Sequence, residues 1–271
     1  MEVKGFEVEG IIKVDNVRVY GLEESIIASG YPMQIDTLDM DRYLNCAGYD
    51  EEILCEGDIK RARHLGNAIA GSGHDCFAKG ITVQFDLQVP EYIWRQLDRY
   101  HFIDYVSSQS KMHRILKMDI DKACNKYVSE YVIDDLNSLI SIYNNYDNVK
   151  EYISNDLLGD TEANCKYLHS AEGWQEYISS DLEWTGNFFI DDKNEIFYRL
   201  RCGEFIKFTK ENLFNIIVAN IPSGLMLTAR MTTNYLQLKS IVNQRSNHKM
   251  QEWRLLCDYF KTLPMFDLVC K

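Results

Sequence analysis

The sequence lacks paired cysteines and long apolar segments, and each absence excludes a class of protein. Its eight cysteines form no C-x-x-C pair, which argues against a structural zinc site. A chain of 271 residues can bury a sizeable core without disulfides, so we expect free thiols. No apolar run approaches the length of a membrane span, and residues 1–7 lack the basic and then apolar regions of a signal peptide. The sequence therefore predicts a cytoplasmic protein with no membrane partner.

Motifs for several common kinds of site are also missing. Gly71-Ser72-Gly73 is followed by Cys76 where a dinucleotide-binding fingerprint has its third glycine. There is no phosphate-loop motif, and no histidine pair has metal-ligand spacing with a carboxylate nearby, so we expect no metal site. A cysteine–histidine nucleophile stays open, because the sequence does not show which residues are neighbours in space. His74, in a glycine-bounded loop, stays open between a structural and a catalytic role.

Positive charge is concentrated in two segments of an otherwise acidic chain. The net charge of −12 disfavours non-specific binding to nucleic acid, so we expect no nucleic-acid partner. Residues 95–117 nevertheless hold five basic and two acidic residues, and residues 228–254 hold five basic residues and one acidic residue. Two such segments favour a local anion site, and the alternative is that both are solvated surfaces.

The stretch over residues 73–114 is predicted to bring cations and hydroxyls together. Apolar and polar residues alternate over residues 81–89, which is the period of a strand with one buried face. Pro90 then opens a helix that has an apolar stripe and a polar, basic side. The stripe consists of Ile93, Leu97 and Tyr100, and the other side carries Arg95, Gln96 and Arg99. Such a layout suits a phosphorylated ligand.

The remaining elements are predicted from hydrophobic period and from capping and turn residues. Asp58 is expected to be the N-cap of a helix that ends at Gly71, and Thr209 the N-cap of another. The other predicted elements are strands within 5–20 with a turn at Asp15-Asn16, helices over 21–28, 36–50, 123–154 and 209–218, a hairpin of 187–190 with 195–200, and one long helix over 232–260, with or without a break.

Five residues of that last predicted helix share one face: Asn234, Leu238, Ile241, Arg245 and His248. Asn234 and Arg245 are about three turns, or roughly 16 Å, apart, so an amide and a guanidinium could hold two parts of a long ligand. Arg245 suits a phosphate, because its guanidinium forks onto two oxygens. The alternative is a helix that packs through its apolar residues and leaves its polar ends in water. The residues alone predict an intracellular α/β protein with a nucleotide or phosphate site.

Several segments resemble the flavin-dependent thymidylate synthase family in their order and spacing. They are Arg63-His64-Leu65, Gly73-His74-Asp75-Cys76-Phe77, Arg95-Gln96 with Arg99, Ala229-Arg230, Asn234, Val242-Asn243-Gln244-Arg245 and Gln251-Glu252. They are similar to the family's Arg-His-Leu helix, its Gly-His-Glu-Thr-Pro-Phe loop, its Arg-His-Arg signature and its closing helix. The chain departs from the signature at Tyr100 and His101, and Lys79-Gly80 replaces a Glu-His pair of the loop.

The resemblance implies an α+β fold: a single domain over residues 1–271 with a mostly antiparallel sheet flanked by long helices. Residues 155–205 would then be an insertion that the family lacks. The implied activity is methylation of dUMP to dTMP, in which NADPH reduces FAD and the reduced flavin mediates methylene transfer from methylene-tetrahydrofolate to carbon-5 of uracil. The implied partners are dUMP and further copies of the chain, in a homotetramer with shared active sites.

The resemblance also implies roles for individual residues. His74 and Arg245 would be catalytic. The substrate-binding set would be Gln96, Arg99, Ser108, Gln109, Ser110, Lys111, Arg230 and Arg245, with the register of residues 108–111 against the family motif left open. The cofactor-binding set would be Ser29, His74, Cys76, Arg99, Tyr100, His101, Asn234 and Lys249. Two alternatives remain: a variant enzyme that leaves another group, such as hydroxymethyl, on the pyrimidine, and a non-catalytic paralogue that binds nucleotide.

Overall fold

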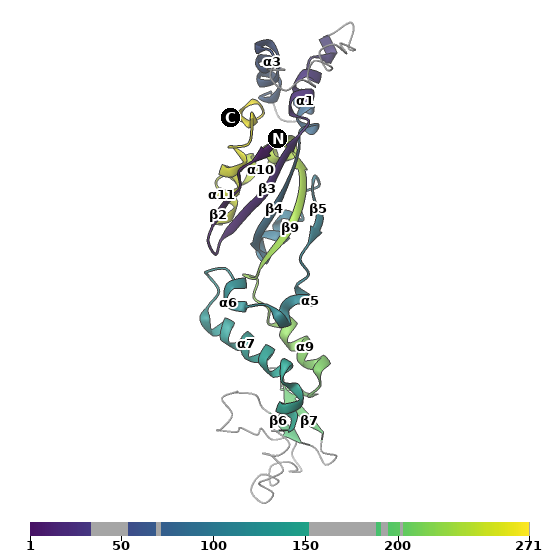
Figure 1. The fold of residues 1–271 in the computed structure, drawn as a ribbon, viewed down its shortest axis with the longest axis vertical. Coiled ribbons are helices and arrows are strands. Elements are labelled where there is room, and N and C mark those ends of the chain that lie inside the picture. Colours follow the sequence, from purple (N-terminus) through teal and green to yellow (C-terminus); the bar gives the residue numbers. More distant parts are fainter. Residues whose placement is uncertain (34–53, 69–71, 152–187, 191–194, 201–202, 271) are drawn as a thin grey trace, which may run out of the picture. The chain divides into compact units, whose positions relative to one another are not determined.

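The chain forms two compact units. The computed structural model describes residues 1–33, 54–68, 72–151, 188–190, 195–200 and 203–270. Unit 1 comprises residues 1–109 and 223–271, and unit 2 comprises residues 110–222. Their helices and strands are labelled in Figure 1. The helix predicted over 36–50 and most of the insertion predicted over 155–205 lie outside the described residues, so a single domain with an insertion stays a prediction.

Unit 1 is built on a six-stranded antiparallel sheet. Its strands are β1 (Glu2–Val3), β2 (Phe6–Val8), β3 (Ile12–Tyr20), β4 (Thr82–Pro90), β5 (Ile103–Ser108) and β9 (Met226–Asn234). The strand order is β1-β3-β4-β9-β5, and β2 also pairs with β3. At the centre, β4 and β9 pair from Thr82 opposite Asn234 to Pro90 opposite Met226. The predicted α+β class with a mostly antiparallel sheet is confirmed.

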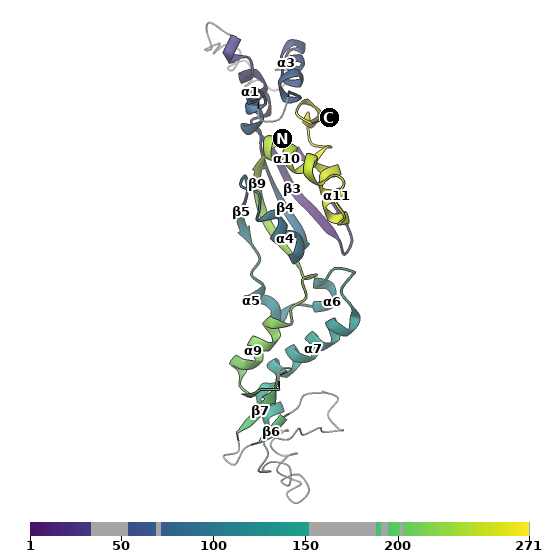
Figure 2. The same cartoon turned by 180° about the vertical axis from the view of Figure 1, so that it is seen from behind.

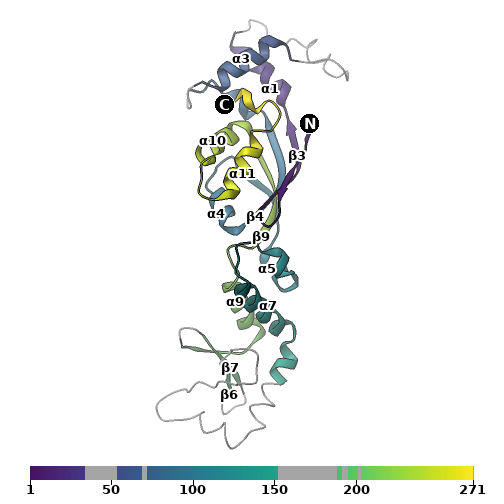
Figure 3. The same ribbon diagram turned by 90° about the vertical axis from the view of Figure 1, so that its left-hand side faces the viewer.

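One face of this sheet carries the core of unit 1. Along β4 every second side chain, from Val83 to Val89, is buried, as the alternation in the sequence predicts. Three helices lie over this face: α4 (Glu91–Leu97), α10 (Tyr235–Arg245) and α11 (Gln251–Phe260) (Figures 2 and 3). Phe85 of β4 meets Phe260 of α11 edge to face. No described helix of unit 1 lies over the opposite face (Figure 1).

Short helices complete unit 1 beyond one end of the sheet. They are α1 (Leu22–Ala28), η1 (Tyr31–Met33), α3 (Glu56–Gly66), η2 (Cys76–Lys79) and, near the C-terminus, η5 (Phe266–Leu268). Helix α3 packs against both α1 and η5. It ends at Gly66, where a Cβ would lie only 2.1 Å from the carbonyl oxygen of Leu268. Only a glycine therefore allows this close approach of two backbones.

Unit 2 is mostly helical. Its helices are α5 (Lys111–Arg114), η3 (Ile115–Lys117), α6 (Ile120–Ala123), α7 (Glu130–Asn144) and α9 (Lys210–Ala219), and β6 (Phe188–Ile190), β7 (Ile196–Arg199) and β8 (Phe205–Lys207) form a small antiparallel sheet. Helices α7 and α9 pack together, with the rings of Tyr143 and Phe214 6.2 Å apart. The predicted hairpin and the predicted cap are both confirmed: β6 pairs with β7, and the Thr209 hydroxyl accepts from the backbone of Asn212. Within the described ranges no helix is long and apolar enough to cross a bilayer.

Several predicted element boundaries were wrong. Asp58 is not an N-cap but the third residue of α3, where its carboxylate accepts from the backbone of Cys55, the actual N-cap. The turn in residues 5–20 lies at Gly10, whose φ is 65°, and residues 15–18 form a bulge within β3 instead. The helix predicted over 123–154 begins only at Glu130, and it is interrupted at Asn145, after which residues 146–151 are helical again.

The helix predicted over 232–260, with or without a break, is present in its broken form, and only its predicted start was wrong. Strand β9 continues to Asn234, α10 covers only residues 235–245, and a turn separates it from α11. Strand β5 was not predicted at all. Its residues after Ile103 are exposed, so they show no alternation of apolar and polar types.

Replacement of Gly66 by alanine is expected to lower the free energy of unfolding by about 2 kcal/mol, because the added methyl group forces the α3 and η5 backbones apart. Gly57 is a matched control on the same helix, since a Cβ there would meet only the Cys55 sulfur at 3.6 Å. Gly57→Ala is expected to stabilise by about 0.5 kcal/mol. Urea unfolding of both variants checks this, and equal midpoints would contradict it.

Candidate functional site

The guanidinium of Arg245 is the centre of the candidate site. Arg245 is the last residue of α10, and three groups from other elements hold it. Its Nε donates to the Tyr100 hydroxyl at 2.8 Å, and its Nη1 donates to Gln96 Oε1 at 3.4 Å. Its Cζ lies 4.9 Å from the centre of the Trp253 ring, which is within the range of a cation–π contact. The guanidinium is thereby fixed in one orientation.

A second layer of contacts fixes the groups that hold Arg245. Trp253 is fully buried, and its Nε1 donates to Gln96 Oε1 at 3.0 Å. The amide nitrogen of Gln96 donates to the Tyr92 carbonyl oxygen at 3.2 Å, so the Gln96 oxygen is turned toward the arginine. The Tyr92 hydroxyl donates in turn to the buried carboxylate of Glu252. Helices α4, α10 and α11 therefore contribute to one preorganised cluster.

Arg245 has no acidic partner within the described residues. Its side-chain contacts are a hydroxyl, an amide oxygen and two aromatic rings, all of them neutral. The residue is partly buried, so water does not fully solvate the charge. A cation held in this way attracts an anion without competition from a carboxylate of the described residues. Chemically, the cluster is suited to bind a phosphate or an enolate-like oxygen.

A cavity of about 520 Å³ lies beside this cluster. It is lined by Gly73, Asp75, Cys76 and Lys79 on one side and by Leu236, Lys239, Ser240, Asn243 and Gln244 of α10 on the other. Gln244 connects the two parts, because its Oε1 accepts at 3.1 Å from the same Tyr100 hydroxyl that binds Arg245. The volume lies in the range of small-molecule sites. Cavity and cation are thus neighbours.

A buried ion pair forms one wall of the cavity. Lys239 Nζ donates to Asp75 Oδ2 at 2.6 Å and to the Gly66 carbonyl oxygen at 2.7 Å. Both side chains are about nine-tenths buried, so the pair fixes the η2 loop and the end of α3 to α10. The pair is structural, and it holds the residues that line the cavity in place.

The predicted site residues divide into those at the cluster and those away from it. Gln96, Tyr100 and Arg245 meet directly, and Cys76 lines the cavity. His74 is exposed on the same loop but does not line the cavity. Asn234 is the N-cap of α10, where its side-chain oxygen accepts from the backbone of Gln237 at 2.9 Å. That role accounts for Asn234 without a ligand.

Other predicted residues lie on the surface or in contacts of their own. Arg99, His101, Ser108 and Lys249 are exposed, and Ser110 and Lys111 belong to unit 2, where Ser110 precedes α5. The Gln109 side-chain oxygen accepts from the backbone of Thr228.

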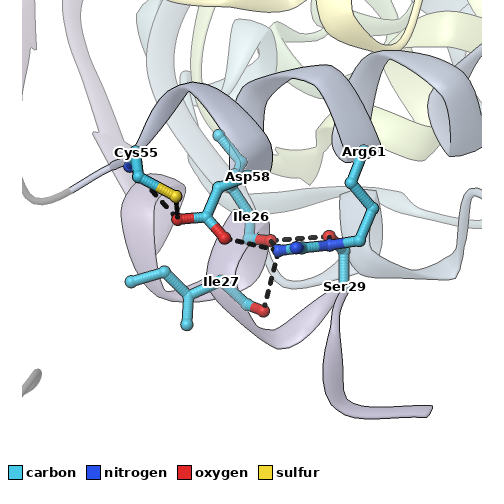
Figure 4. Close-up of polar contacts among 6 residues, drawn as sticks. All are labelled: Ile26, Ile27, Ser29, Cys55, Asp58 and Arg61. Atoms are coloured by element: carbon cyan, nitrogen blue, oxygen red, sulfur yellow. Dashed lines mark hydrogen bonds and ion pairs between the residues drawn. The ribbon is translucent and has the colours of Figure 1, made fainter. Parts of the chain in front are cut away.

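Arg230 and Ser29 are held by residues far from them in the sequence. Arg230, on the sheet face opposite the helices, donates to Asp86 at 3.2 Å and to the Asn16 carbonyl oxygen at 2.7 Å. Figure 4 shows Ser29 against Arg61, whose Nε donates to the serine hydroxyl at 3.1 Å. Within one chain, neither residue reaches Arg245.

Sequence reasoning missed Trp253 and the cavity lysines. Trp253 lies on the buried side of the strongly amphipathic helix α11. An aromatic residue shortly after Arg245 in the sequence was the signal that could have predicted a cation–π contact. Lys239 gave no signal, because its partner Asp75 is far away in the sequence.

Burial raises the pKa of the Cys257 thiol to about 11, so this cysteine is protonated at neutral pH. Among the described residues no cluster of three metal-ligating side chains exists.

Taken together, the fold and the cluster define an α+β protein with a candidate anion site beside a ligand-sized cavity. In structure, the chain resembles flavin-dependent thymidylate synthase ThyX from Helicobacter pylori, solved in complex with FAD and dUMP, at a TM-score of 0.51 and 12% identity over 95% of this chain and 99% of that one. Another structure of ThyX from the same organism with FAD and dUMP matches at 0.49 and 10% identity, over 96% and 97% of the two chains. No protein-family model matches the sequence, and no curated protein matches it. The resemblance is therefore one of fold.

Replacement of Asp75 by alanine is expected to lower the free energy of unfolding by about 3 kcal/mol, because it leaves the Lys239 ammonium buried without its counter-charge. The double variant Asp75→Ala with Lys239→Met removes the charge as well and is expected to be more stable than the single variant. Thermal and urea unfolding measure both. A double variant no more stable than Asp75→Ala would show that the buried charge is not the cause.

Proposed function

We propose that this protein is a flavin-dependent thymidylate synthase that converts dUMP to dTMP with FAD, NADPH and methylene-tetrahydrofolate. The observation that carries the proposal is the Arg245 guanidinium, oriented by Gln96, Tyr100 and Trp253 and without an acidic partner in the described chain. The fold shared with the H. pylori enzyme supports it, since that enzyme was solved with FAD and dUMP. Unlike the fold alone, the cluster indicates where a nucleotide would bind.

The residues around the cavity fit a flavin nucleotide. Lys79 offers an ammonium group, Ser240 a hydroxyl, and Asn243 and Gln244 amides, beside the thiol of Cys76. These are the donors and acceptors that ring carbonyls and phosphates require. In the proposal these residues hold FAD, with His74 at the rim, and FAD when bound supplies the electron transfer that the reaction needs.

The protein's share of the chemistry is to bind and orient. In the proposal Arg245 binds dUMP and stabilises negative charge that develops on the uracil oxygen, since its orientation is set before the ligand arrives. Gln96 keeps the guanidinium aimed, and the indole of Trp253 excludes water from one side of it. Arg230 points to the other face of the sheet. Arg99, His101, Ser108 and Arg230 would therefore serve the site of another copy in the proposed homotetramer.

A variant product is the second candidate. Tyr100 stands where the family signature has histidine. Its hydroxyl accepts a hydrogen bond from Arg245 and donates one to Gln244. The second candidate therefore rests on this departure from the signature, and it would leave another group, such as hydroxymethyl, on carbon-5 of the pyrimidine. Mass spectrometry of the nucleotide product, after incubation with dUMP, methylene-tetrahydrofolate and NADPH, separates methyl from hydroxymethyl.

The purified protein is expected to be yellow, or to become yellow with added FAD, and dUMP is expected to change its flavin absorbance, because the two ligands would lie against each other. A visible spectrum with and without dUMP measures this. A folded protein that stays colourless with excess FAD would overturn the proposal.

Arg245→Ala is expected to weaken dUMP binding by about 2 kcal/mol, the loss of a charge-assisted contact, without unfolding the chain. Arg95→Ala is the matched control, because Arg95 lies on α4 with its side chain 72% exposed in a surface pair with Glu91. Calorimetric titration with dUMP checks both variants. Equal affinities for the two would remove Arg245 from the site.

A further inference from the structure

The turn between α10 and α11 contains His248, which contacts the same Trp253 ring as Arg245. The backbone N–H of His248 donates to the Arg245 carbonyl oxygen at 2.9 Å, so the turn begins directly at the arginine. The imidazole lies edge-on against Trp253, with ring centres 6.2 Å apart. Arg245 therefore stacks on the same indole that His248 contacts.

The imidazole of His248 closes a chain of contacts that returns to Arg245. The Met250 N–H donates to His248 Nδ1 at 3.2 Å, which fixes Nε2 as the protonated nitrogen of the neutral ring. The Gln96 amide nitrogen contacts the Met250 sulfur at 3.2 Å, and the Gln96 oxygen faces Arg245. His248, Met250, Gln96 and Trp253 thus form one connected support for the guanidinium.

The charged groups around His248 favour its neutral form. Burial lowers its pKa below 6.5, as do Arg245 of α10, Arg254 of α11 and Lys249 of the turn, whereas Glu252 of α11 opposes them. On α4, Tyr92 is bound to that Glu252. Because Nε2 already carries a proton, a second proton can only bind at Nδ1, and there it removes the acceptor of the Met250 N–H.

We propose that neutral His248 is a positioning residue for Arg245, and that its protonation releases the turn and weakens the binding of a phosphate-bearing nucleotide. The inference rests on the proposed function for the identity of the ligand, but the contact chain itself does not depend on it. Acidification breaks the Met250–His248 bond, loosens the Met250 contact with Gln96 and lets the guanidinium move. The site is then active in the neutral range and fails at acid pH.

The sign of the pH dependence separates this mechanism from simple charge attraction. A protonated His248 that merely added a positive charge beside Arg245 would draw an anion more strongly at acid pH. A His248 that acts through the turn instead weakens anion binding at acid pH, because its protonation lets the Arg245 guanidinium move. For the fold itself, a histidine whose pKa is lower in the folded state contributes stability that is present above its ordinary value of 6.5 and is lost as the pH falls through its folded-state pKa.

Two substitutions distinguish the acceptor from the titratable group. In His248→Asn the side-chain oxygen can replace Nδ1 as the acceptor of the Met250 N–H but cannot titrate. In His248→Ala the acceptor is lost at every pH. The dissociation constant for dUMP is measured by calorimetry between about pH 5.5 and about pH 8, the range in which histidine changes its charge. The phosphate of dUMP titrates in the same range and affects all three proteins alike.

In the wild type, we expect affinity to fall roughly five- to tenfold on acidification relative to His248→Asn, which corresponds to one hydrogen bond. His248→Ala is expected to bind roughly five- to tenfold more weakly at about pH 8. Wild type and His248→Asn with the same pH profile, or tighter binding by the wild type at acid pH, would overturn the inference.

A measurement without nucleotide separates this inference from the proposed function. The indole N–H resonance of Trp253, assigned with Trp253→Phe, reports its hydrogen bond to Gln96. In the free wild-type protein it is expected to shift with a midpoint below pH 6.5, and in His248→Asn it is expected to stay constant. A shift of this kind in a protein that does not bind dUMP would support His248 and refute the proposed function. A resonance that does not respond to pH would refute the role of His248 whatever the protein binds.

Discussion

The pairing of β4 with β9 is the constraint on which the candidate site depends. The two strands are antiparallel over nine residues, and each is followed at once by a helix. Helix α4 therefore leaves the sheet at the Pro90 end, and α10 leaves it at the opposite end, after Asn234. Both helices run back over the same face (Figure 2), and Gln96 and Arg245, near their ends, meet through a hydrogen bond. A shift of one residue in this pairing would turn the buried side chains of β4 to the other face and separate Gln96 from Arg245.

The sequence predicted the parts of this arrangement that depend on local pattern. The strict alternation over residues 81–89 predicted β4 and its buried face, because a strand between two neighbours with one covered face requires that period. The pattern over residues 232–260 predicted the helices that the structure shows as α10 and α11, although Asn234 caps the first of them and does not lie within it. Strand β5 has both its faces largely exposed, so its sequence carries no periodic signal.

The contacts between distant segments were beyond sequence reasoning. Arg230 was predicted only as a member of a basic segment and of the substrate-binding set, and its contacts with Asp86 and Asn16 come from strands that the fold places beside it. Ser29 looked like a ligand contact, but its hydroxyl bridges Ile26 and Arg61. In both cases the sequence did not show which residue lies next to the side chain in the folded protein. The hydrophobic periodicity of a segment carries no information on its neighbours in space.

The neutral character of the groups around Arg245 is the strongest reason to regard it as a binding residue. A carboxylate partner would offset the cost of burying the guanidinium, and Asp58 does so for Arg61 at 2.7 Å elsewhere in unit 1. Such a partner would also have to be displaced before a phosphate could bind. Aromatic faces and neutral oxygens instead orient the charge and leave its attraction for an anion intact. In the proposal, this arrangement lacks the stability that a salt bridge would provide, and the guanidinium stays available to bind an anionic ligand.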